Sequence, residues 1–255
     1  MSDRAPRLLI LGGTTEATAL VTALAGNRAF APILSLAGRT RAPAASPIPV
    51  RVGGFGGAEG LARYLRDEGI ARLIDATHPF AAQISAHAVA AAARIGVPLV
   101  ALTRPPWQAE AGDRWRHVAD IAGAVAALAG PPEHVLLALG RMHVAAFATQ
   151  PQHHYVLRFV DPPAERPVLP DHHLVVDRGP FTVAGDRALI AAHGIQRIVC
   201  KNAGGSGARA KLVAARELGV PVLMIDRPAL PERATVDSVA AVFDWLADHD
   251  ADRGV

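Results

Sequence analysis

The stretch Leu8-Leu9-Ile10-Leu11-Gly12-Gly13-Thr14-Thr15-Glu16-Ala17, near the start of the 255-residue chain, indicates the fold. Its apolar residues predict a buried strand, the glycine pair predicts a tight turn, and a helix is expected to follow. Such a turn lets the backbone approach a pyrophosphate, and the helix N-terminus offers N–H groups and the positive end of a dipole. The two glycines are adjacent, unlike those of G-x-G-x-x-G, so an ordinary strand-to-helix turn stays open as the alternative.

The same alternation of strand and helix continues along the chain. Short apolar runs end in Gly, Pro or Asp, and Ala-rich helical stretches follow them, which predicts an α/β fold with parallel strands covered on both faces. Strands are predicted near 7–11, 31–36, 49–52, 72–75, 98–102, 134–139, 155–159, 173–177, 197–200 and 220–225. Helices are predicted near 14–26, 57–69, 79–95, 119–129, 182–194, 207–218 and 236–248.

An internal repeat indicates two similar halves. Residues 93–105 match residues 216–228 at one constant offset, with Gly-x-Pro and Arg-Pro at the same places in both. We therefore expect two Rossmann-like domains with parallel sheets, residues 1–130 and 131–255, with a ligand cleft between them. Helix–Gly–Val–Pro–strand is also a common way to enter any buried strand, and the sequence leaves open whether the halves share edge strands.

Composition excludes several classes of protein. The chain is 51% hydrophobic and 19% charged, which indicates a globular core, and its net charge of +3 is too small to indicate a nucleic-acid partner. The single Cys200 excludes a disulfide framework and a cysteine-based zinc cluster. No apolar run is long enough for a membrane span and the N-terminus does not resemble a signal peptide, so a cytoplasmic protein is expected.

Arginine and histidine are both abundant in the chain. Only Lys201 and Lys211 are lysines, so arginine supplies nearly all the positive charge. Codon bias explains this excess, and the alternative is that some arginines bind phosphate or carboxylate groups. The histidines include the adjacent pairs 153–154 and 172–173 but lack the i, i+4 spacing of a helical zinc site, so no metal is expected.

The first half carries the features of an NADP site. After the second predicted strand, Arg39 and Thr40 stand where an NAD-binding protein usually has an acidic residue, which suits the 2′-phosphate of NADP. After the third, the stretch Gly53-Gly54-Phe55-Gly56 allows close approach to the adenosine or pyrophosphate. After the fourth, Thr77 and His78 precede a predicted helix; Thr77 is predicted to contact the cofactor, and His78 could face the nicotinamide or the substrate. A solvated basic loop, a flexible turn and simple helix capping are the respective alternatives.

The second half carries a predicted anion site. A strand, a glycine loop and a helix follow one another at 199–211, and this loop has the lysine ahead of its glycines, unlike a kinase-type phosphate loop. Arginines and aromatic residues at other strand ends would suit a large flat ligand with many carboxylates. The predicted substrate-binding residues are Arg104, Trp107, Arg141, Arg178, Phe181, Lys201, Asn202, Gly204, Gly205, Ser206, Gly207 and Arg209.

Taken in order, these motifs resemble those of the precorrin-6A reductase family of cobalamin biosynthesis, over roughly residues 7–248. The matching stretches are Leu11-Gly-Gly-Thr-Thr-Glu16, Ala37-Gly-Arg-Thr40, Asp75-Ala-Thr-His-Pro-Phe80, Arg104-Pro-Pro-Trp107, Arg178-Gly-Pro-Phe181 and Lys201-Asn-Ala-Gly-Gly205. The resemblance implies NADPH-dependent reduction of a ring double bond in precorrin-6A, giving precorrin-6B. A related branch of the family acts on the cobalt-containing ring.

The resemblance also implies roles for the predicted residues. Gly12, Gly13, Thr14, Thr15 and Glu16 would hold the pyrophosphate, and Arg39 with Thr40 would select NADPH. The arginines, Lys201 and the glycine loop would bind the carboxylates of the tetrapyrrole. His78 or Lys201 could supply a proton, and so could solvent.

Two other functions stay open at this point. One is an NADP-dependent reductase or epimerase of a smaller substrate, although the Tyr-x-x-x-Lys dyad of short-chain dehydrogenases is absent. The other is an NADP-binding sensor without turnover. The sequence leaves the oligomeric state open, and a monomer is the default expectation.

Overall fold

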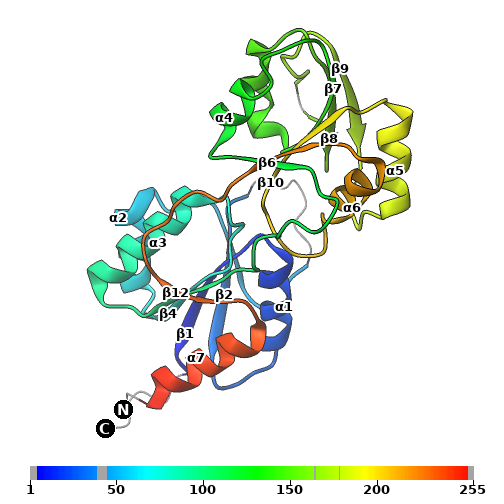
Figure 1. Ribbon diagram of the computed structural model, residues 1–255. Coiled ribbons are helices and arrows are strands. Elements are labelled where there is room, and N and C mark those ends of the chain that lie inside the picture. The colour runs from blue at the N-terminus through cyan, green and yellow to red at the C-terminus, as the bar shows by residue number, and fades with distance from the viewer. Residues whose placement is uncertain (1–4, 39–44, 164, 178, 252–255) are drawn as a thin grey trace. The chain divides into compact units, whose positions relative to one another are not determined.

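The computed structural model describes residues 5–38, 45–163, 165–177 and 179–251. The chain divides into two compact units (Figure 1). Unit 1 comprises residues 1–105 and 229–255, and unit 2 comprises residues 106–228. Each unit contains a six-stranded sheet in which neighbouring strands run parallel.

The sheet of unit 1 has the strand order β12-β5-β4-β1-β2-β3. Its strands are β1 (Arg7–Leu11), β2 (Ala31–Leu36), β3 (Val50–Val52), β4 (Ile70–Asp75), β5 (Leu99–Leu102) and β12 (Ala234–Val236). Its helices are α1 (Thr15–Leu24), α2 (Gly57–Asp67), α3 (Ala82–Ile95) and α7 (Val239–Ala251).

Both faces of this sheet are buried, as its continuous apolar strands predict. Along β1, Leu8 and Ile10 pack with residues of α1 and α7, whereas Leu9 and Leu11 pack with residues of α2 and α3. Helices α1 and α7 therefore cover one face and α2 and α3 the other (Figure 1). Open α/β sheets bind their ligands at the carboxyl ends of the central strands.

The sheet of unit 2 has the equivalent order β6-β11-β10-β7-β8-β9. Its strands are β6 (Trp115–Val118), β7 (His134–Ala138), β8 (His154–Phe159), β9 (His172–Val176), β10 (Arg197–Lys201) and β11 (Val222–Ile225). Its helices are α4 (Ile121–Ala126), the 3-10 helix η1 (Arg141–Thr149), α5 (Val183–Ala192) and α6 (Ala210–Leu218). The helix η1 stands where unit 1 has α1.

The predicted domain boundary near residue 130 is wrong. The chain leaves unit 1 after Pro105 and returns after Pro228, and these two prolines are equivalent in the internal repeat. The end of the first repeat, β6 and α4, joins the sheet of unit 2, while the end of the second, β12 and α7, joins the sheet of unit 1. The two repeats thus exchange their last strand and helix.

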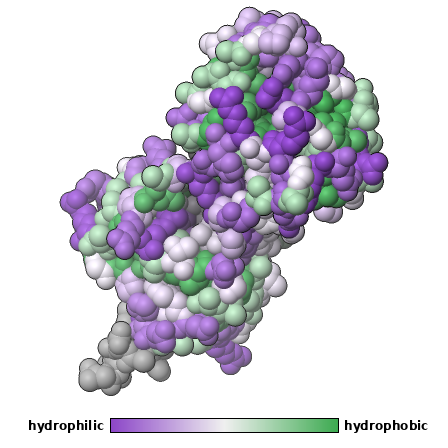
Figure 2. Space-filling view, in the orientation of Figure 1, coloured by the Kyte–Doolittle hydropathy of each residue, from purple (hydrophilic) through white to green (hydrophobic). Residues whose placement is uncertain are grey.

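The predicted strands and helices agree with the structure apart from three short elements. The sequence did not reveal β6, β12 or η1. The two strands have only four and three residues, and neither is a continuous apolar run. Within the described residues, no helix is long and apolar enough to cross a membrane. On the face shown in Figure 2, hydrophobic residues are interspersed with hydrophilic ones.

Candidate functional site

The turn between β1 and α1 has the shape that the sequence predicts. A Cβ atom on Gly12 would lie 2.5 Å from Cδ1 of Leu34, and Gly13 has a φ angle of +119°, which side chains rarely allow. Ala17 is buried in the first turn of α1 and keeps the helix close to the sheet. Close packing against Leu34 thus favours glycine at position 12, and the backbone conformation favours it at position 13.

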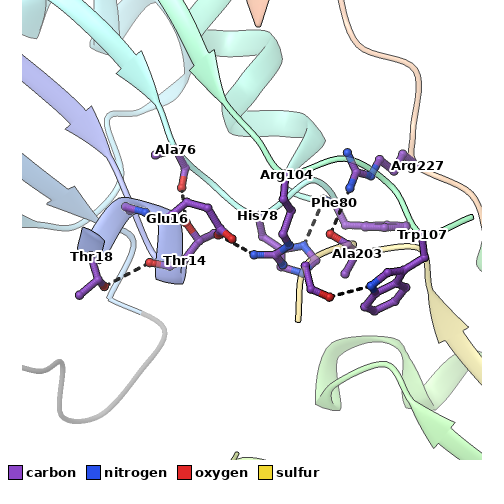
Figure 3. A network of polar contacts seen from close by, with 12 residues as sticks. Thr14, Glu16, Thr18, Ala76, His78, Phe80, Arg104, Trp107, Ala203 and Arg227 are labelled. Atoms are coloured by element: carbon purple, nitrogen blue, oxygen red, sulfur yellow. Dashed lines mark hydrogen bonds and ion pairs between the residues drawn. The ribbon is translucent and has the colours of Figure 1, made fainter. Parts of the chain in front are cut away.

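Thr14 joins this turn to the neighbouring strand end. Its hydroxyl oxygen accepts a hydrogen bond from the N–H of Ala17, which caps α1, and donates one to the carbonyl of Ala76 at 2.8 Å (Figure 3). The turn after β1 and the turn after β4 are thus held together at the carboxyl edge of the sheet. Thr15 and Glu16 are the first two residues of α1, where the N–H groups lack intrahelical acceptors.

A buried carboxylate organises the turn after β4. Oδ1 of Asp75 accepts hydrogen bonds from the backbone N–H and the hydroxyl of Thr77, at 3.1 and 2.7 Å. Its other oxygen, Oδ2, accepts from Arg233 at 2.9 Å, and the two side chains are only 1% and 11% exposed. Thr77 therefore serves to fix this turn, and its hydroxyl also lies 3.3 Å from that of Ser85.

His78 follows in the same turn and is half-buried. Its Nδ1 accepts a hydrogen bond from the N–H of Phe80 at 3.2 Å. A neutral imidazole whose Nδ1 is an acceptor carries its proton on Nε2. His78 is thus placed to donate a hydrogen bond from Nε2 at the carboxyl edge of unit 1.

Arg104, predicted to bind substrate, lies in unit 1 and forms an ion pair with Glu16. Its Nη1 lies 2.6 Å from Oε2 of Glu16 (Figure 3). Partial burial raises the pKa of Glu16, but its own backbone N–H and the Arg104 guanidinium outweigh burial, so the pKa lies below its usual value. Glu16 is therefore ionised at neutral pH.

The glycine loop between β3 and α2 is held by an arginine. The guanidinium of Arg51 donates to the carbonyls of Gly53 and Gly54, at 2.5 and 2.7 Å, and stacks 3.7 Å from the ring centre of Phe55. The predicted stretch 53–56 is thus a fixed loop rather than a flexible one. Arg39 and Thr40, the residues predicted to contact the 2′-phosphate, lie outside the described residues.

In unit 2, Trp107 and Asn202, both predicted to bind substrate, contact each other and the glycine loop. Trp107 is 8% exposed and packs in the core. The amide of buried Asn202 bonds both the N–H and the carbonyl of Trp107, at 2.7 and 3.1 Å. The indole N–H of Trp107 donates to the carbonyl of Gly205 at 2.7 Å. Asn202 therefore fixes the backbone of Trp107, and the Trp107 indole fixes the glycine loop.

Further donors hold the other carbonyls of this loop. Lys211 is buried and donates from Nζ to Ala208 at 2.6 Å, and burial lowers the pKa of this amine. Arg227 donates to the carbonyls of Asn202 and Ala203 at 3.0 and 3.1 Å. In the part of the chain that the structure describes, the N–H groups of residues 204–208 have no protein acceptor. A row of such N–H groups is an anion-binding surface.

The remaining predicted residues of unit 2 lie at several places. Lys201 ends β10 and is half-buried, and Gly204 is buried whereas Ser206 and Gly207 are exposed. Arg209 is exposed and forms an ion pair with Glu110. Arg141 is exposed at the start of η1, and Phe181 lies under the guanidinium of Arg158 at 4.0 Å. Arg178 lies outside the described residues.

Four supporting residues were not found from the sequence: Arg51, Gly60, Arg227 and Arg233. Two of them carried a usable signal. Gly60 is a glycine inside a helix, and Arg227 is the repeat equivalent of Arg104. The described residues contain no group of three or more His, Cys, Asp or Glu side chains that could hold a metal ion.

The fold and the turn after β1 define a class of protein. A parallel sheet with a glycine turn between its first strand and first helix is Rossmann-like, and unit 2 repeats the same topology. The family model for "Precorrin-6x reductase CbiJ/CobK" matches residues 7–247. The chain belongs to this family, and it is an oxidoreductase of cobalamin biosynthesis.

Individual relatives agree with this assignment. A precorrin-6A reductase of Rhodobacter capsulatus is 57% identical over 98% of this chain and 99% of its own length. A cobalt-precorrin-6A reductase of Priestia megaterium is 28% identical over 91% of this chain and 94% of its own length. The solved structure of a CobK precorrin-6A reductase is 56% identical, with a TM-score of 0.90 over 96% of this chain and 97% of that chain. The family and fold predicted from the sequence are thereby confirmed.

Proposed function

We propose that the chain reduces precorrin-6A to precorrin-6B with NADPH as the reductant. The observation that carries the proposal is the turn between β1 and α1, whose glycines and helix N-terminus suit a pyrophosphate, in a chain of this reductase family. The metal-free ring is favoured over the cobalt-containing one because the relative named for the former is far more similar.

The residues present fit NADPH. The Gly12–Glu16 turn would face the pyrophosphate, because Gly13 has no side chain and the N–H groups of the first turn of α1 lack intrahelical acceptors. The fixed loop 53–56 would border the adenosine half. Arg39 and Thr40 would meet the 2′-phosphate, which their sequence position after β2 favours.

The protein's part in the reaction is mainly to position the reactants. When bound, NADPH supplies a hydride to an electrophilic carbon of the conjugated ring. The reduced conjugated system also takes up one proton, which the imidazolium form of His78 would donate, leaving a neutral imidazole. Lys201, at the end of β10, is the second candidate for this proton transfer.

The glycine loop of unit 2 would bind carboxylates of the tetrapyrrole. Its carbonyls are held by Trp107, Lys211 and Arg227, and its N–H groups at 204–208 have no protein acceptor among the described residues. The oxygens of a carboxylate can accept hydrogen bonds from such N–H groups. Lys201 adds a positive charge beside the loop.

Turnover by the purified chain tests the reaction itself. NADPH oxidation is followed optically with metal-free precorrin-6A, with NADH as the cofactor control. Turnover with NADPH and little with NADH is expected. Turnover only with the cobalt-containing ring would change the substrate assignment, and tight NADPH binding without turnover on either ring would indicate a sensor.

Arg39→Ala tests the 2′-phosphate assignment. We expect the dissociation constant for NADPH to rise about 10- to 100-fold, because a charge-assisted hydrogen bond contributes roughly 1.5–3 kcal/mol. NADH, which lacks the phosphate, should bind the variant and the parent alike. Arg63→Ala, an exposed arginine of α2, is the matched control. Equal weakening of both cofactors would contradict the assignment.

Trp107→Phe tests the glycine loop. The variant keeps an aromatic ring in the core but removes the N–H that holds Gly205, so the KM for precorrin-6A should rise about 3- to 10-fold, as for loss of one hydrogen bond of ~1 kcal/mol. The dissociation constant of NADPH should not change. Trp115→Phe is the control, since the buried indole N–H of Trp115 has no partner in the structure. Equal effects of both substitutions on KM would argue against the loop.

A further inference from the structure

We propose that Arg104 is a residue of the cofactor site, where it neutralises Glu16 so that the N-terminus of α1 can accept the pyrophosphate. This inference rests on the proposed function, in which that turn binds NADPH. It replaces the predicted role of Arg104 as a substrate-binding residue.

The geometry places both charges at the same edge of one sheet. Glu16 is the second residue of α1, and Arg104 follows the end of β5, with β4 lying between β5 and β1. Arg104 therefore reaches across the end of β4 to contact Glu16, at 2.6 Å (Figure 3). The side chains are only 17% and 22% exposed, so solvent and salt screen this pair less than a surface pair.

The charge at this position needs compensation. An acidic residue in the first turn stabilises a helix, because it interacts with the positive end of the dipole. A pyrophosphate bound at the same N–H groups would meet the ionised Glu16 at close range, and like charges repel. Glu16 is ionised, since its pKa lies below the usual value. The guanidinium of Arg104 removes this repulsion by balancing the carboxylate.

The internal repeat supports the assignment. Arg227 stands at the position of Arg104 in the second repeat, and it too turns toward a ligand-binding loop within its own unit. There it donates to the carbonyls of Asn202 and Ala203, beside the anion-binding loop. In both units, the arginine of the Arg-Pro pair thus supports an anion site inside its unit.

A double-mutant cycle tests the proposal. The dissociation constant of NADPH is measured by fluorescence titration for the parent chain, Arg104→Gln, Glu16→Gln and the double variant. Arg104→Gln should bind NADPH about 10-fold more weakly, Glu16→Gln about 3-fold more tightly, and the double variant within about 3-fold of the parent. Arg104→Lys keeps the charge and should stay within about 3-fold of the parent.

The controls separate this role from others. Arg94→Gln breaks an exposed ion pair with Glu59 in the same unit and should leave NADPH binding unchanged. The KM for precorrin-6A should also be unchanged in Arg104→Gln at saturating NADPH. A raised KM with unaltered NADPH binding would overturn the inference in favour of a substrate contact, as would a double variant as weak as Arg104→Gln.

NADPH binding by the parent chain distinguishes failure of the proposed function from failure of this inference. A parent chain that bound no NADPH would overturn the cofactor assignment and this inference with it. A parent chain that bound NADPH, together with an unaffected Arg104→Gln, would overturn this inference alone. If Arg104→Gln did not fold, the expected tighter binding by Glu16→Gln and near-parental binding by Arg104→Lys would still decide the matter.

Discussion

Arg233→Gln is expected to lower the free energy of unfolding by about 3–5 kcal/mol, because it leaves the buried carboxylate of Asp75 without its charged partner. The side chain of Asp75 is 1% exposed, so water cannot replace the lost guanidinium. Asp75 also fixes Thr77 in the turn that carries His78. A loss of turnover should therefore accompany the loss of stability.

Urea unfolding with parallel activity assays measures this effect. Asp75→Asn combined with Arg233→Gln should be less destabilised than Arg233→Gln alone, because the neutral amide no longer needs a cation. Arg94→Gln, which breaks an exposed ion pair, should cost only ~0–1 kcal/mol. An Arg233→Gln variant as stable as the Arg94→Gln control would show that the Asp75 pair does not stabilise unit 1.

Gly60→Ala is expected to destabilise unit 1 although alanine is the better helix former. An added Cβ would lie 1.7 Å from the carbonyl oxygen of Phe55, which is backbone and cannot rotate away. Relief requires that the loop 53–56 move from α2. Overpacking of this kind costs typically about 1–3 kcal/mol, more than the ~1 kcal/mol gained from helix propensity. The displaced loop should also weaken NADPH binding about 10-fold, equivalent to ~1.4 kcal/mol.

The matched control for stability is Gly54→Ala, in the same loop. A Cβ there would meet no atom within 4 Å, and the residue does not have a positive φ angle. Its thermal unfolding should match that of the parent chain. If Gly60→Ala proved as stable as the parent, the close packing of α2 against the loop would have no energetic importance.

Local sequence patterns were sufficient for most of the fold. Strands buried on both faces must be continuous apolar runs, and Leu8–Leu11 and Ile198–Cys200 are such runs. The strands β6 and β12 were not predicted. Each lies at a sheet edge, where few side chains are buried and the sequence therefore needs no apolar run. The repeat was visible in the sequence, yet its exchanged ends were not. Parallel strands pair through backbone groups, which are the same for either partner sheet.

The candidate site also has parts that the sequence located and parts that only the tertiary structure decided. Residue type and position along the chain were enough to locate the Gly12–Glu16 turn, the turn after β4 and the glycine loop of unit 2, because glycines, caps and strand ends act locally. The roles of Arg104, Trp107 and Arg233 depended on partners far away in sequence, namely Glu16, Gly205 and Asp75. Whether an arginine or a tryptophan faces a ligand or supports a loop follows from burial and from which groups the fold brings within hydrogen-bonding distance, and neither property is local to the chain.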